Sequence, residues 1–148
     1  MAEGFHRFRD QRGVGLIETL VAVLVLAIGV LGVGAMLMTS LRNNQSSMER
    51  TQAVIQTSAM MDVMRANKAE AIIGRYNLSS WTCNAPAADN PVGASQNAWL
   101  GAVKAELGPQ SCGRILCSSL ACEVHVRWND SRGASGNDQQ VYTLRSRL

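Results

Sequence analysis

The chain has 148 residues, 47% of them apolar, a size that suits one small domain with one additional element. It carries 14 lysines and arginines against 11 aspartates and glutamates, and the resulting net charge of +3 is scattered along the chain. This excess is too small and too dispersed for a nucleic-acid-binding protein, so no nucleic-acid partner is expected.

The N-terminal region changes character abruptly at Val14, after 13 polar and mildly basic residues. Between Glu18 and Arg42 lie 23 residues without a single charge. A helix of that length reaches about 35 Å, enough to cross a hydrocarbon core of about 30 Å. An acid at the start of such a segment is unusual for a simple membrane anchor. The basic residues ahead of the segment are typical of a cytoplasmic flank, and they are Arg7, Arg9 and Arg12.

The helical pattern is predicted to continue past the apolar run, because no proline occurs before Pro86. We expect one helix from about Val14 to about Arg75, apolar all round in its first half and amphipathic in its second. In the second half an apolar stripe is expected to pack on the rest of the domain, with charged residues on the opposite side of the helix. The stripe comprises Leu41, Met48, Ile55, Ala59, Ala66 and Ile73, and the charged residues are Arg50, Arg65 and Lys68.

Three methionines in the same half, Met60, Met61 and Met64, allow two interpretations. Methionine side chains are flexible and polarisable, so the cluster is suited to an adaptable contact surface for partner helices. Ordinary packing in the core of the domain explains it equally well.

The rest of the chain reads as an irregular connection over residues 77–97, a short helix and then strands. The helix is predicted from Ser95 to Leu107, because its apolar residues are four apart and Gly108-Pro109 ends it. Strict alternation predicts a half-buried strand over Leu120–Trp128, and a second over Gln140–Ser146. A third, shorter strand is expected around Ile115 and Leu116, and a polar loop over Asn129–Asp138.

These elements predict an α+β fold, in which a long N-terminal helix packs on a small antiparallel sheet. Each apolar face then covers the other, which is the usual way for such elements to bury both.

All four cysteines lie in the second half of the chain, at Cys83, Cys112, Cys117 and Cys122. An even number in a small exported domain predicts two disulfides and an oxidising compartment. Four cysteines allow three pairings, and the sequence does not choose among them. Zinc binding is disfavoured, because zinc ligands usually come as tight Cys-x2-Cys pairs, so no metal is expected.

His125 is the only histidine after residue 13, and any Ser-His-Asp or Cys-His mechanism would depend on it. The alternation places it in mid-strand on the face opposite the apolar residues, where it is expected to face solvent. The chain has no Gly-rich phosphate loop and no metal-binding histidine pair. We therefore expect no catalytic residue, no cofactor and no enzymatic activity.

The residues Arg12-Gly13-Val14-Gly15-Leu16-Ile17-Glu18, followed by the apolar run, resemble the leader of the type IV prepilins. In that family a short basic leader ends in glycine, and the fifth residue of the mature chain is glutamate. A cut after Gly13 places Glu18 fifth. The leader is also too polar for a secretory signal, because the apolar segment follows the cut and stays in the product.

The resemblance implies that prepilin peptidase cleaves between Gly13 and Val14 and that Val14 becomes N-methylated. It also implies a pilin-like fold and a role for Glu18 in assembly. A carboxylate in an apolar helix is costly unless it meets a cation, and the new α-amino group of a neighbouring subunit's first residue is suitable. Such a pair would set the axial register of a filament.

Other residues narrow the resemblance to the minor pilins. The expected mature chain begins Val-Gly where Phe-Thr is common, and its apolar helix lacks the proline that major pilins often have. The segment Met61–Asn67 is similar to one in the PilV group of minor pilins. Membership implies a scarce subunit that joins other minor pilins and the major pilin, and engages the inner-membrane assembly platform. Its role would be to prime filament assembly at or near the tip.

The expected organisation is a cytoplasmic leader over residues 1–13, a membrane and filament-core helix over 14–41, an amphipathic continuation over 42–76, and a periplasmic head over 77–148. The precursor would be a single-pass protein among inner-membrane lipid, with its N-terminus cytoplasmic, and would later enter the pilus. Three alternatives stay open: a minor pseudopilin of a type II secretion system, a membrane-anchored periplasmic enzyme or binding module, and a structural membrane coiled-coil subunit.

Overall fold

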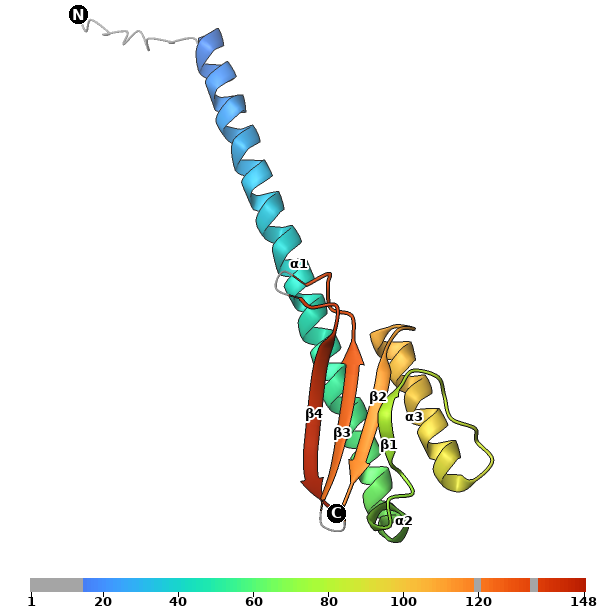
Figure 1. The fold of residues 1–148 in the computed structure, drawn as a ribbon. Helices are drawn as coiled ribbons and strands as arrows, with labels where there is room; N and C mark the ends of the chain where they lie inside the picture. Colours follow the sequence, from blue (N-terminus) through green and yellow to red (C-terminus); the bar gives the residue numbers. More distant parts are fainter. Residues whose placement is uncertain (1–14, 119–120, 134–135) are drawn as a thin grey trace, which may run out of the picture. The chain divides into compact units, whose positions relative to one another are not determined.

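The computed structural model describes residues 15–118, 121–133 and 136–148, and these form three helices and four strands (Figure 1). The chain divides into two compact units, residues 1–38 and 39–148. Helix α1 begins in the first unit, and the remaining elements belong to the second. The elements are α1 (Leu16–Ala66), α2 (Lys68–Ile72), β1 (Leu78–Thr82), α3 (Pro91–Leu107), β2 (Cys112–Cys117), β3 (Ala121–Trp128) and β4 (Gln140–Arg147).

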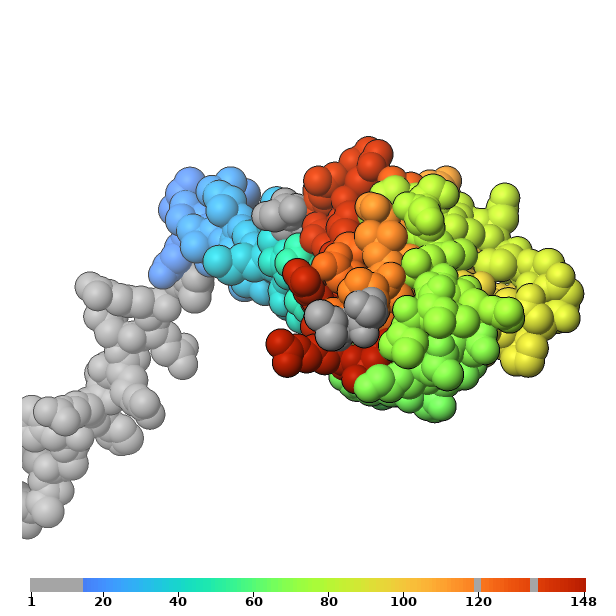
Figure 2. Space-filling view, turned by 60° about the horizontal axis from the view of Figure 1, so that its bottom comes forward, coloured from blue at the N-terminus to red at the C-terminus, as the bar shows by residue number. Residues whose placement is uncertain are grey.

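The strands form one antiparallel sheet in the order β1-β2-β3-β4. Figure 2 shows the end of the second unit where the last residues of the chain, in red, lie near the green α2 region. The predicted α+β fold class is confirmed, with an apolar N-terminal helix, a four-stranded antiparallel sheet and two disulfides.

A single core fills the space between one face of the sheet and the helices. Alternate residues of β3 are buried, as the alternation predicts, and α3 adds the spaced residues Trp99, Val103 and Leu107. The indole N–H of Trp99 donates to the backbone oxygen of Gln56 at 3.0 Å, which ties α3 to α1. All three methionines, Met60, Met61 and Met64, are buried in this core, so core packing is the correct interpretation.

The predicted apolar stripe of the long helix is wrong, because it lies on the opposite side of α1 from the buried residues. Ala53, Thr57 and Met60 face the core, about 180° around the helical wheel from Ile55. The sequence pattern does not indicate this buried side, because it includes the polar residue Thr57. Thr57 can be buried because its hydroxyl donates to the backbone oxygen of Ala53, within the same helix, at 2.9 Å. All members of the expected stripe are exposed, namely Leu41, Met48, Ile55, Ala59, Ala66 and Ile73.

The charged residues predicted to lie away from the domain instead contact it. Arg50 Nη2 lies 3.8 Å from a carboxylate oxygen of Asp130. Arg65 Nη2 donates to the hydroxyl of Ser146 at 2.6 Å, and Lys68 Nζ donates to the backbone oxygen of Leu148 at 2.8 Å. Arg50 and Arg65 thus fix this side of α1 to the loop before the last strand and to the last strand itself, and Lys68 of α2 adds a contact with the final residue.

The long helix ends earlier than predicted, at Ala66 rather than near Arg75. Asn67 has low helix propensity, and its side-chain amide donates to the hydroxyl of Tyr76 at 3.2 Å. After α2 the chain turns at Gly74, whose φ of +79° is left-handed. The N–H groups of Gly74 and Arg75 donate to Ala71 and Glu70, both at 3.0 Å, which is the Schellman pattern of a helix end.

Two further boundaries differ from the predictions. Strand β1 lies within the segment expected to be irregular. It is preceded by Asn77, whose side-chain oxygen accepts from the Cys117 N–H at 2.6 Å, as a strand backbone would. Helix α3 begins at Pro91 rather than Ser95, because Asn90 caps it by accepting from the N–H of Gly93 at 2.8 Å.

The other strand predictions are confirmed with small changes of length. Strand β2 is longer than the pair Ile115 and Leu116, and β4 extends to Arg147. Strand β3 ends at Trp128 as expected, whereas Leu120, its predicted first residue, lies outside the described residues.

Candidate functional site

The site predicted from the sequence is the start of the chain, and the structure describes it only in part. Gly13 and Val14, the expected cleavage and methylation residues, lie outside the described residues. Glu18 lies in the first turn of α1, where its N–H donates to the oxygen of Gly15 at 3.0 Å. A carboxylate there is favoured by about 0.3–1 kcal/mol, because the helix N-terminus carries a partial positive charge.

The apolar segment that follows Glu18 is uncovered. Every large apolar side chain between Leu16 and Leu41 is more than half exposed. At about 25 cal/mol per Å² of apolar surface, such a helix is unfavourable in water and requires an apolar environment. Helix α1 is long and apolar enough to cross a membrane.

Three glycines leave open space on the surface of this segment. A methyl group added at Gly29, Gly32 or Gly34 would meet nothing within 4 Å. The surface around Gly29 and Gly34 is a shallow apolar hollow that also involves Val30 and Val33. Small residues of this kind allow the backbone of another helix to approach closely.

The four cysteine candidates form two disulfides, Cys83–Cys112 and Cys117–Cys122. The first ties the segment after β1 to the start of β2, and the second joins directly opposed residues at the end of the β2–β3 hairpin. Each of the four sulfur atoms is bonded to another sulfur, so none of these cysteines is a free thiolate that could bind zinc.

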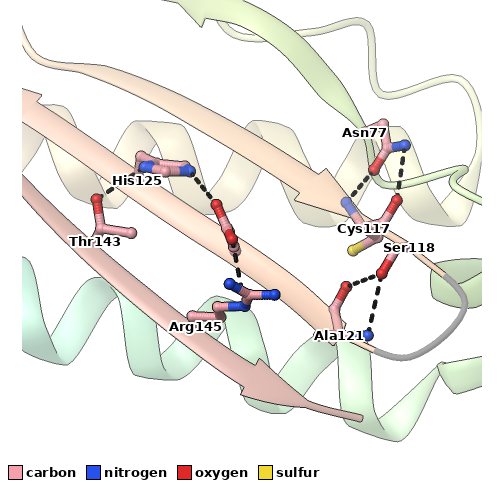
Figure 3. Close-up of polar contacts among 8 residues, drawn as sticks. Asn77, Cys117, Ser118, Ala121, His125, Thr143 and Arg145 are labelled. Atoms are coloured by element: carbon pink, nitrogen blue, oxygen red, sulfur yellow. Dashed lines mark hydrogen bonds and ion pairs between the residues drawn. The ribbon is translucent and has the colours of Figure 1, made fainter.

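His125 lies on the sheet face opposite the core, as predicted, but its side chain is only 14% exposed. The ring meets Trp81 edge to face at 6.3 Å, which shields it from solvent. Its Nδ1 lies 2.8 Å from the hydroxyl of Thr143 on β4, and its Nε2 lies 3.4 Å from the carboxylate of Glu123 (Figure 3). Burial lowers the pKa of His125, an effect that Glu123 opposes and Arg114 reinforces.

Hydroxyl, imidazole and carboxylate follow one another here as they do in an acyl-transfer triad. The hydroxyl of Thr143, however, belongs to the residue directly opposite His125 in a regular antiparallel ladder. Cross-strand pairs of this kind stabilise a sheet whether or not they do chemistry. The contact therefore accounts for the position of His125 without a catalytic role.

A family model described as the prokaryotic N-terminal methylation motif matches residues 8–34. Comparisons with curated proteins and with solved structures find no match. The matched residues include Gly13, Val14 and Glu18, on which the resemblance to prepilins rests. They end before Met61–Asn67, so the PilV grouping stays a prediction.

The motif and the fold together support a type IV pilin-like protein, either a type IV pilin or a pseudopilin. The motif implies processing by prepilin peptidase, and with the apolar helix it supports anchoring in a membrane. Proteins with this motif are structural pilins, which is consistent with a non-enzymatic role.

Proposed function

We propose that this chain is a minor pilin of a type IV pilus that helps to prime filament assembly at or near the tip. The observation that carries the proposal is the methylation motif over residues 8–34, which includes the start of α1. In this part of the helix, from Leu16 to Leu41, every large apolar side chain is more than half exposed. Prepilin peptidase cleaves the precursor between Gly13 and Val14 and methylates Val14. The helix lies first in inner-membrane lipid and then among the helices of other subunits.

Glu18 supports this proposal because its carboxylate begins an otherwise uncharged helical segment. A lone carboxylate in an apolar environment costs at least a few kcal/mol. The α-amino group of a neighbour's Val14 neutralises it in the filament and fixes the axial register of the two subunits.

The exposed stripe of α1 also supports assembly with other helices. Leu41, Met48 and Ile55 are each at least half exposed and lie on the side of α1 that faces away from the core. An apolar stripe at helical spacing with nothing over it is typical of a surface that packs against partner helices. Other minor pilins and the major pilin are the proposed partners, together with the inner-membrane assembly platform.

The proposed topology places residues 1–13 in the cytoplasm, residues 14–41 in the membrane, and residues 42–76 and 77–148 in the periplasm. Two disulfides in the second unit favour an oxidising compartment for that part of the chain.

The experiment that tests the class is N-terminal sequencing and intact mass of the protein from cells with and without prepilin peptidase. We expect a chain that starts at Val14 and is heavier by one methyl group, and only when the peptidase is present. A chain that starts at Met1 or Ala2 in both strains would contradict the proposal. It would indicate an uncleaved, membrane-anchored periplasmic domain instead.

A second experiment separates a pilin from a pseudopilin of a type II secretion system, which shares the motif. Deletion of the chain is expected to reduce surface pili and twitching while protein secretion continues. The opposite result would assign the chain to the secretion system.

A further inference from the structure

The sheet face that points away from α1 and α3 carries a group of arginines, here called the outer basic face. It comprises Arg114 on β2, Arg127 on β3, and Arg145 and Arg147 on β4, with Trp81 and His125 beside them. Strand register and alternation place all four arginines on this face, because the intervening residues Val124 and Val126 are buried in the core.

The charge of this face is not balanced within the sheet. Glu123 is the only acidic residue in the four strands, whereas all four of their basic residues are arginines on this face. The Glu123 carboxylate lies 3.4 Å from both Arg145 Nε and His125 Nε2, so it neutralises at most one guanidinium. Three formal positive charges stay uncompensated by acids of the sheet.

Two of the guanidinium groups, those of Arg127 and Arg114, have hydrogen-bonding capacity that the described residues leave unused. The Arg127 guanidinium lies over the Trp81 ring at 4.8 Å. Among the residues that the structure describes, its nitrogens reach weak or distant acceptors, Gln139 at 3.5 Å and the Cys112 sulfur at 3.6 Å. Arg114 Nε is buried and has no hydrogen-bond partner in the described part of the chain. Guanidinium groups fixed in this way bind carboxylates with two parallel hydrogen bonds.

The kind of partner follows from the residues that accompany the charge. Interfaces between proteins are enriched in arginine and tryptophan and depleted in lysine, and the outer basic face has four arginines, Trp81 and no lysine. Val141, opposite Arg127 on the same face, adds an apolar side chain that is 42% exposed. Faces that bind nucleic acid use lysine and arginine alike for phosphate contacts.

We propose that the outer basic face docks an acidic segment of another protein, whose carboxylates pair with Arg127, Arg145 and Arg147. The site of Glu123, between Arg145 and His125, shows how this face holds a carboxylate (Figure 3). The proposal applies equally to a pilin and a pseudopilin, so its failure would leave the assembly role intact.

The test measures binding of fluorescent poly-L-glutamate to the full chain in non-ionic detergent at low salt. We expect the double variant Arg145→Glu, Arg147→Glu to bind about tenfold or more weakly, since each reversal turns an attraction into a repulsion. The matched control is Arg75→Glu, Arg132→Glu. These side chains are 66% and 71% exposed, lie off the face, and each contact one glutamate, as Arg145 does. It changes the net charge by the same amount and is expected to bind within about twofold of the unaltered chain.

Three outcomes would overturn the proposal. If poly-L-glutamate does not bind to the unaltered chain, the outer basic face is not a binding site for carboxylates. Equal losses in the two double variants would show attraction to net charge rather than to this face. An oligothymidylate of matched charge that binds more tightly than poly-L-glutamate, with a loss confined to the Arg145 and Arg147 variant, would assign the face to nucleic acid. Circular dichroism of both variants checks that the fold is retained.

Discussion

At the scale of single residues, Asp130 is the most completely buried acid in the described part of the second unit, at 2% exposure. Its carboxylate accepts from the hydroxyl of Ser46 at 2.6 Å and lies 3.8 Å from Arg50, so the loop after β3 is held on α1. Asp130→Asn is expected to lower the free energy of unfolding by about 1–3 kcal/mol, because it weakens both contacts in a buried site. Urea unfolding followed by tryptophan fluorescence measures the loss. The control Asp138→Asn, at an exposed residue of the same loop, should leave the midpoint unchanged.

His125 predicts a pH dependence of stability. Burial places its folded-state pKa below the ordinary value of 6.5, against the influence of Glu123 and with that of Arg114. The unfolded chain therefore binds the proton first as pH falls, and the free energy of unfolding decreases below about pH 6.5 until the folded-state pKa is passed. Between about pH 7.5 and about pH 5, His125→Gln should reduce the slope of stability against pH. Equal slopes for His125→Gln and the unaltered chain would count against this account.

At the scale of elements, the sequence predicted those parts whose pattern is local. Strand β3 alternates strictly and α3 has apolar residues four apart, and the ends of both, Trp128 and Leu107, were predicted correctly. The start of α3 was predicted four residues too late, at Ser95 rather than Pro91. The resemblance to prepilins was readable for the same reason, since the residues that carry it, Arg12–Glu18 and the apolar run after them, are contiguous in the chain. Strand β1 was missed because Ser79 and Ser80 are polar and exposed, so its backbone pairing leaves no apolar signature.

Features that depend on contacts between distant residues were not predictable in the same way. The buried side of α1 was misassigned because Thr57 interrupts it, while the exposed side repeats apolar residues at heptad spacing. The outer basic face combines residues from four strands. Only the register brings Arg114, His125 and Thr143 into one row, so the isolated arginines gave no signal.

The packing of α3 on β2 predicts opposite effects for two glycine substitutions. A methyl group at Gly113 would lie 2.4 Å from the Trp99 ring, so Gly113→Ala forces the helix and strand apart and should cost about 1–3 kcal/mol. Gly101, within α3, has nothing within 4 Å of the same methyl position, and Gly101→Ala should stabilise by up to about 1 kcal/mol. Thermal unfolding of both variants tests the contact, and a shift of the same sign in both would contradict it.

The two disulfides should contribute unequally to stability. Cys83–Cys112 closes a separation of 29 residues, whereas Cys117–Cys122 closes one of 5. The loss of chain entropy in the unfolded state gives about 4 kcal/mol for the first and about 2 kcal/mol for the second. Paired Cys→Ser variants compared by urea unfolding measure the difference. A larger loss on removing Cys117–Cys122 would show that hairpin contacts rather than loop entropy dominate.

At the scale of the whole molecule, α1 serves both assembly and folding, and it uses different segments and different sides of the same helix for the two. Its residues Leu16–Leu41 are uncovered all round, which suits a lipid environment and then the neighbours' helices. Farther along, one side builds the core through Met60 and Met64 while the opposite side stays apolar and exposed. A monomer in water gains nothing from the exposed side, so the stripe is informative about assembly rather than about folding.

This division predicts that assembly and folding respond to different substitutions on the same helix. Met48 and Ile55 are 64% and 50% exposed, so the double variant Met48→Lys, Ile55→Lys should change the free energy of unfolding by no more than about 0.5 kcal/mol per site. Covering both side chains with partner helices is worth roughly 1 kcal/mol or more each, and a buried lysine reverses that gain. The variant should therefore be cleaved and folded normally but enter filaments poorly, as measured by its amount in sheared surface filaments relative to the membrane. Ala105→Lys, on the exposed side of α3, is the control and should enter filaments normally. Normal entry of the double variant would mean that the stripe faces solvent in the assembly, and the contact surface of α1 would then be limited to the uncovered segment Leu16–Leu41.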